Sequence, residues 1–200
     1  MRYGSSLYQR PLMARLPTLL TASLLLLCFL VACDRPGVSS DPWLFNHEDA
    51  HYEIQFSGDW VAESPDELNP FADVAASFDD RIFFIVITQQ LPDYPSPELR
   101  DLEDLALGHL RESVDSLEVE RRGPLSLDGV DGSTIISSGH LDGDDLTYIT
   151  SYALYDDIGY QLIAFSEEDH RQELFTEVDA LLSDWRFLPL DNDGEGAELP

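Results

Sequence analysis

Lysine is absent from this 200-residue sequence, and all 11 basic residues are arginine. The sequence contains 39 acidic residues, so its formal net charge is −28 at pH 7. A protein field of this sign repels nucleic acid and bare anionic lipid, and we therefore expect neither as a ligand. The sequence is still 44% hydrophobic and 10% aromatic, which is enough apolar material for a folded core.

Acidic residues are also missing from residues 1–33, a segment that contains Arg2, Arg10 and Arg15. A mainly apolar run follows from Leu19 to Val31, and it is shorter than the roughly 20 residues that a membrane-spanning helix needs. Basic residues before a short apolar run are typical of a secretory signal. The sequence therefore predicts a signal peptide over residues 1–32.

The apolar run ends in Leu30-Val31-Ala32-Cys33, which resembles the bacterial lipobox. The resemblance implies cleavage before Cys33, diacylglycerol on its sulfur and acylation of the new N-terminus, and several acyl chains on one residue give a stable anchor. An ordinary signal peptide and an uncleaved anchor are the alternatives. Asp34 resembles an inner-membrane retention signal, so we expect the periplasmic side of the bacterial inner membrane rather than the outer membrane.

Cysteine is scarce, because only Cys28 and Cys33 are present. Cys28 would leave with the signal and Cys33 would carry lipid, so we expect no disulfide in the mature protein. The mature chain keeps eight of the 11 arginines and all 39 acidic residues, a formal net charge of −31. Its composition predicts a flexible tether over residues 33–50, one folded domain over residues 51–189 and a disordered acidic tail over residues 190–200.

Within the domain, apolar alternation and acidic or glycine-containing turns predict antiparallel hairpins. The segment 82–91 is apolar on both faces, so we expect it in the centre of the sheet. The predicted strands are residues 51–56, 72–78, 82–91, 125–127, 132–141, 146–155 and 160–165.

Two apolar stripes at helical spacing predict two amphipathic helices. Ser96 and Pro97 are typical of the start of the first helix, and Ser166 of the start of the second. The first stripe is Leu99, Leu102, Ala106, Leu110, Val114 and Leu117; the second is Leu174, Val178, Leu181 and Trp185, widened by Phe175 and Leu182. The predicted fold class is α+β, a mainly antiparallel sheet covered by two helices.

Three segments resemble the PsbP-like fold family, which includes PsbP itself and DcrB-like bacterial envelope lipoproteins. They are the opening strand and turn from Tyr52 to Trp60, the turn from Leu127 to Gly132, and the closing Trp185-Arg186-Phe187. The resemblance implies an α/β/α sandwich that works through protein partners and has no shared catalytic centre. A fold analogy does not assign a site, so the chemistry is argued separately.

His47-Glu48-Asp49-Ala50-His51 matches the zinc-hydrolase pattern His-Glu-x-x-His. That chemistry needs a helix, because only a helical turn places both imidazoles on one metal ion. Here the motif runs directly into a predicted strand, and Asp49 stands where the pattern has an apolar residue. A zinc-dependent hydrolase using His47, Glu48 and His51 is therefore an alternative function, and we favour the interpretation that these residues hold no metal.

Other catalytic and ligand-binding patterns are missing. The sequence has no Gly-x-Ser-x-Gly nucleophile motif and no Gly-Lys-Ser/Thr phosphate loop. The turn 142–145 and the tail 191–195 imitate parts of calcium loops but lack the closing glutamate, so a Ca²⁺-responsive acidic surface is a second alternative. We expect no catalytic residue and no cofactor, and we predict a lipid-anchored, non-catalytic module that binds or assembles with a protein partner.

The acidic excess has two interpretations. A negative surface accelerates encounter with a basic partner and orients it. A dense carboxylate coat also keeps an exported protein hydrated in salt water. Because acids are spread along nearly the whole domain and lysine is absent, we favour salt adaptation.

Overall fold

The computed structural model describes residues 41–91 and 98–189. The predicted signal peptide, the lipobox residues Leu30–Cys33, the first part of the tether, the cap residues Ser96 and Pro97, and the acidic tail lie outside these ranges. The elements are β1 (Trp43–His47), β2 (Tyr52–Phe56), β3 (Trp60–Glu63), α1 (Pro65–Leu68), β4 (Val74–Phe78), β5 (Ile82–Gln90), α2 (Leu99–Ser113), β6 (Asp115–Leu127), β7 (Val130–Leu141), β8 (Asp144–Tyr155), β9 (Ile158–Glu167), a 3-10 turn (Glu168–His170), α3 (Arg171–Ser183) and β10 (Trp185–Phe187).

Seven strands form one antiparallel sheet in the order β3-β4-β5-β9-β8-β7-β6. The turns use aspartate and glycine in the left-handed region, with Asp79 and Asp80 between β4 and β5 and Asp142 and Gly143 between β7 and β8. Aspartate and glycine tolerate that conformation better than other residues. The sequence-predicted hairpins and the central place of β5 are confirmed.

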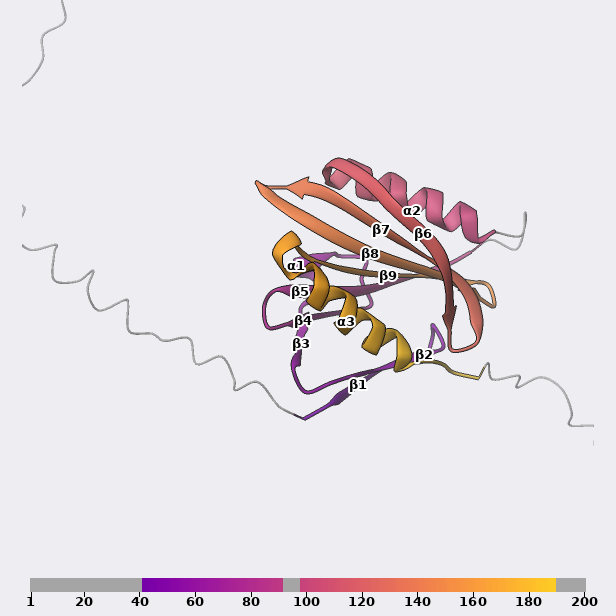
Figure 1. Cartoon of the computed structure of the whole chain (residues 1–200). Helices are drawn as coiled ribbons and strands as arrows, with labels where there is room; N and C mark the ends of the chain where they lie inside the picture. The colour runs from indigo at the N-terminus through magenta and orange to yellow at the C-terminus, as the bar shows by residue number, and fades with distance from the viewer. Residues whose placement is uncertain (1–40, 92–97, 190–200) are drawn as a thin grey trace, which may run out of the picture. The chain divides into compact units, whose positions relative to one another are not determined.

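The two long helices cover opposite faces of this sheet (Figure 1). Leu102, Ala106 and Leu107 of α2 pack on Ile135 and Tyr152, which point to one face. The adjacent residues Ile136, Ile149 and Ala153 point to the other face, which α3 covers through Leu174, Val178 and Leu181. Successive residues of a strand point to opposite faces of the sheet, so one strand contacts both helix layers. The predicted α+β class, with a mainly antiparallel sheet and two covering helices, is confirmed.

A second sheet of three strands, in the order β1-β2-β10, completes the layer that contains α3. The sequence assigned residues 43–47 to the tether, but they form β1, so the folded domain begins before residue 51. The Trp43 ring stacks on Phe56 at 4.0 Å between centroids, and its Nε1 donates to the Trp60 carbonyl at 2.9 Å. These contacts bury apolar surface that a solvated tether would expose.

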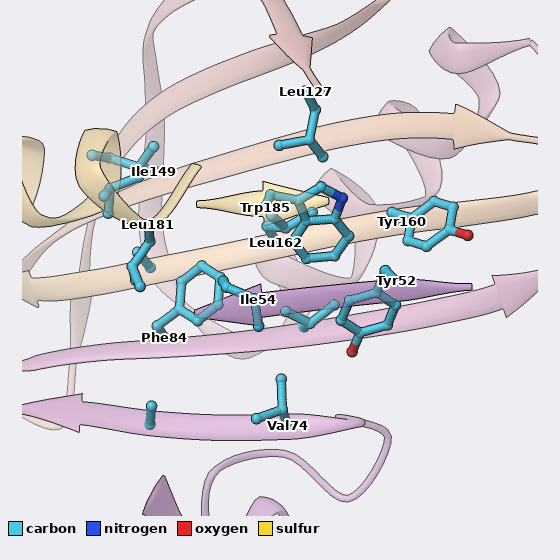
Figure 2. Packing of buried hydrophobic residues seen from close by; sticks show 14 of the residues in the cluster. Tyr52, Ile54, Val74, Phe84, Leu127, Ile149, Tyr160, Leu162, Leu181 and Trp185 are labelled. Atoms are coloured by element: carbon cyan, nitrogen blue, oxygen red, sulfur yellow. The ribbon is translucent and has the colours of Figure 1, made fainter. Parts of the chain in front are cut away.

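The main core lies between the two sheets, where aromatic rings meet. Tyr52 stacks on Trp185 at 4.4 Å, and Tyr160 meets both rings edge-on at 6.0 Å. Figure 2 shows these three rings together, with Leu162 beneath Trp185 and Leu127 above it. Trp185 is completely buried, as expected for a residue of the predicted apolar stripe. It belongs to the strand β10, however, and not to the helix α3.

Two boundaries differ from the sequence predictions. β6 covers 13 residues rather than three, and it is the edge strand, so its solvated charges interrupt the apolar alternation that marks an inner strand. α2 ends at Ser113, so Val114 is its C-cap and Leu117 lies in β6. At its start, Glu98 and Asp101 form a reciprocal capping box. Among the described residues, no helix is both long and apolar enough to cross a membrane.

Candidate binding site

The predicted metal motif lies in the tight turn between β1 and β2. His51 adopts a positive φ of 51°, and its backbone N–H donates to the Glu48 carbonyl at 3.2 Å. His47 Nδ1 accepts a hydrogen bond from the Ala50 N–H at 3.1 Å. The motif therefore has no helical turn to place its two imidazoles on one ion, which agrees with the expectation from the following strand. Nowhere in residues 41–91 and 98–189 do three His, Cys, Asp or Glu side chains form a group suited to a metal ion.

His47 instead faces Asp73, with 3.8 Å between Nε2 and Oδ1. Since Nδ1 accepts the Ala50 hydrogen bond, the neutral imidazole carries its proton on Nε2, toward this carboxylate. The second Asp73 oxygen and the Tyr52 hydroxyl are buried without a hydrogen-bond partner among the described residues. Burial, followed by the charge of Asp73, raises the pKa of Tyr52 far above its usual value. This cluster lies where the β1–β2–β10 sheet meets the segment that leads into β4.

The acidic turn 142–145 also has a structural role. It connects β7 to β8, and across it His140 Nδ1 lies 3.0 Å from Asp145 Oδ1. The rest of the calcium-like sequence, residues 191–195, lies outside the described residues, as does Cys33. Of the predicted candidates, the structure therefore places His47, Glu48 and His51 in one turn and does not assemble them into a site.

The cavity of interest lies between α3 and the β6–β7 side of the sheet, and we call it the α3 groove. Its volume is about 370 Å³. Strands of the sheet supply its floor and α3 its wall. Figure 1 shows the helix α3 lying across one face of this sheet. The lining residues are Arg121, Gly123, Pro124 and Leu125 of β6, Thr134 and Ile136 of β7, Ile149 of β8, and Phe175, Val178, Asp179 and Leu182 of α3.

Local sequence explains why the groove exists. Arg121, Gly123 and Leu125 alternate on one face of β6 and pair with Ile136, Thr134 and Gly132 of β7. Gly123 supplies no side chain, and a Cβ added there would meet no atom within 4 Å. The floor is therefore open where a larger residue would fill it.

An ion-pair cluster ties α3 to β6 beside the groove. Arg171, at the start of α3, binds both carboxylate oxygens of Glu120, with 2.9 Å from Nη1 to Oε1. The Arg171 hydrogen bond lowers the pKa of Glu120, and the same bond raises the pKa of Arg171. Arg171 also lies 5.5 Å from the Phe175 ring centroid. This bidentate pair holds the two sides of the groove together.

The groove was not among the sequence-predicted sites. Its strand β6 was largely missed, because the sequence predicted a strand only over residues 125–127. One feature of the sequence indicated an additional apolar surface on α3. Phe175 and Leu182 make the apolar stripe of this helix wider than a narrow core contact needs. Both side chains are only partly buried, and they form part of the groove wall.

Comparison with solved structures identifies the architecture. The chain is similar to cyanobacterial PsbP (CyanoP) from Synechocystis sp. PCC 6803, with a TM-score of 0.58 and 15% identity over 79% of this chain and 98% of that chain. The chain has a PsbP-like fold. This confirms the resemblance noted in the sequence.

Two further structures share the PsbP-like arrangement. LpqN from Mycobacterium tuberculosis, a protein involved in cell envelope biogenesis, matches with a TM-score of 0.57 and 14% identity over 74% of this chain and 91% of that chain. The Ran-binding protein Mog1p from Saccharomyces cerevisiae matches with a TM-score of 0.51 and 8% identity over 75% of this chain and 97% of that chain. No protein-family model and no curated protein sequence matches the chain. At these identities, the likeness concerns the fold.

Proposed function

We propose that this protein is a lipid-anchored component of the bacterial cell envelope that acts as a non-catalytic binding or assembly module. Its anchor is lipid on Cys33, and its folded domain projects on the periplasmic side of the inner membrane. The α3 groove is the binding face. No nucleic acid and no cofactor take part.

The observation that carries the proposal is the combination of a lipobox directly behind a signal-type apolar run with a PsbP-like domain that has an open groove. The LpqN likeness supports an envelope role, since that protein is involved in cell envelope biogenesis. The resemblance to the PsbP-like family implies no shared catalytic centre, and a groove of this kind is suited to holding a ligand, which supports a binding role.

Metabolic labelling with radioactive palmitate tests the anchor. We expect label on the wild type and on Cys28→Ala, because Cys28 leaves with the signal peptide, and no label on Cys33→Ala. The wild type and Cys28→Ala should remain in the membrane fraction, since several acyl chains anchor stably, while a processed Cys33→Ala is released.

The two cysteine variants are a matched pair, because each removes one thiol from the same short segment. Equal palmitate labelling of Cys28→Ala and Cys33→Ala would refute the anchor. Loss of label in Cys28→Ala alone would show that the lipid is attached to Cys28. That result would also refute an anchor on Cys33.

A further inference from the structure

We propose that the α3 groove binds a zwitterionic single-chain amphiphile, with the apolar chain in the groove and the two charges of the head group on Arg121 and Asp179. The inference rests on the proposed envelope function, which places the domain beside a membrane that supplies such molecules. The chemical class is a phosphate ester with an attached ammonium group, as in a lysophospholipid.

The lining of the groove combines apolar and polar side chains. Leu125, Ile136, Ile149, Phe175 and Leu182 line a space of about 370 Å³, together with the polar side chains of Arg121, Thr134 and Asp179. That space lies at the lower end of ligand pockets, and it has room for roughly ten water-sized groups, which suits part of an alkyl chain. Burying each methylene of such a chain contributes about 0.8 kcal/mol.

Two side chains of opposite charge, Arg121 and Asp179, line the groove. The Arg121 side chain forms no hydrogen bond or ion pair within the described residues, although acidic side chains are abundant. Arg81, Arg100, Arg122 and Arg171 each have a carboxylate partner, whereas Arg111 on the helix α2 has none within the described residues either. Arg121 differs from Arg111 because it lines the groove. Asp179 also has no partner within the described part of the chain. The two charges stand on opposite sides of the groove, one on β6 and the other on α3.

This pair of charges selects among head groups. An anionic amphiphile would meet Arg121 but also Asp179 and the acidic field of the whole domain. A cationic one would meet Asp179 and be opposed by Arg121. A zwitterion satisfies both side chains and adds no net charge, so it is the head group that the groove fits best.

The test measures binding of three amphiphiles with the same dodecyl chain, each below its micelle concentration. The head groups are phosphocholine, sulfate and trimethylammonium, and the readout is the set of NMR chemical-shift changes in the full domain. We expect the phosphocholine compound to bind about tenfold more tightly than either singly charged one, a factor equal to about 1.4 kcal/mol. Arg121→Gln and Asp179→Asn should each remove this preference.

A glycine pair supplies the steric control. Gly123→Leu places a side chain into the open groove and should abolish binding. Gly108→Leu, on α2 across the sheet, should leave binding unchanged. A Cβ at either position meets no atom within 4 Å, so both variants are expected to fold.

Three outcomes would overturn the inference: equal affinity for the three head groups, binding that survives Gly123→Leu, or shift changes confined to other surfaces. A groove that captures only an apolar segment of a protein would also give no head-group preference. The palmitate experiment separates the two proposals. Palmitate label on Cys33 without amphiphile selectivity would support the lipid anchor and refute the proposed ligand. Amphiphile selectivity without palmitate label would support the ligand and refute the anchor.

Discussion

At the scale of single residues, the core contains two tyrosine hydroxyls in contrasting situations. The Tyr160 hydroxyl donates to the Ala50 carbonyl at 2.6 Å and so ties the β1–β2 turn to β9. The Tyr52 hydroxyl is buried without a partner in the described residues. Burial is the main cause that raises the pKa of both. A buried hydroxyl stabilises a fold only where it gains a hydrogen bond.

Replacing each tyrosine with phenylalanine tests this contrast. We expect Tyr160→Phe to lower the free energy of unfolding by about 1–2 kcal/mol, because it leaves the Ala50 carbonyl without its donor. Tyr52→Phe should change it by less than about 0.5 kcal/mol, since it removes a polar atom that has no partner. Urea unfolding followed by tryptophan fluorescence measures both. A larger loss in Tyr52→Phe than in Tyr160→Phe would contradict the assignment.

Residue patterns predicted the turns more reliably than the site. Asp79, Asp128, Asp142 and Asp156 mark hairpin turns in the sequence, and each adopts positive φ. A turn depends on a few adjacent residues, which sequence reasoning can read. The α3 groove depends instead on how far α3 lies from β6, a tertiary distance that no local pattern contains.

At the scale of elements, the edges of the sheets were harder to predict than their centres. β5 and β8 are covered on both faces, so they contain many apolar residues, and these strands can be recognised in the sequence. β1 and β6 are edge strands, and two of the five residues of β1 and eight of the 13 residues of β6 are exposed. Their sequences therefore look like a linker or a charged loop, although both strands take part in the fold.

Truncation tests whether β1 belongs to the domain. A chain that begins at Asp41 should keep the free energy of unfolding of the mature chain. A chain that begins at Glu48 should lose about 2–4 kcal/mol, because it removes Trp43 and Phe45 from the core and the stack on Phe56. Urea unfolding of the two chains measures the difference. Equal stability would show that residues 43–47 act as a tether after all.

At the scale of the whole molecule, the acidic excess limits what the domain can bind. The mature chain has a formal net charge of −31, counted from eight arginines and 39 acidic residues. The few arginines of the folded part mostly pair with carboxylates, as Arg171 does with Glu120. Screening at high salt weakens the repulsion among the remaining acids, which fits the interpretation of the acidic coat as salt adaptation. Within the described residues, the side chains of Arg111 and Arg121 form no such pair, and of these two only Arg121 lines the α3 groove.

The central claim is that the anchored protein binds through the α3 groove. Photo-crosslinking in living cells tests it most directly, with a photoreactive phenylalanine analogue at Phe175 in the groove or at Phe71 on a surface loop. Phe71 is 77% exposed, so random encounters would favour it. We predict a discrete adduct from position 175 that Gly123→Leu removes, and none of the same mass from position 71. Adducts of equal mass and yield from both positions, or none from position 175, would contradict the account.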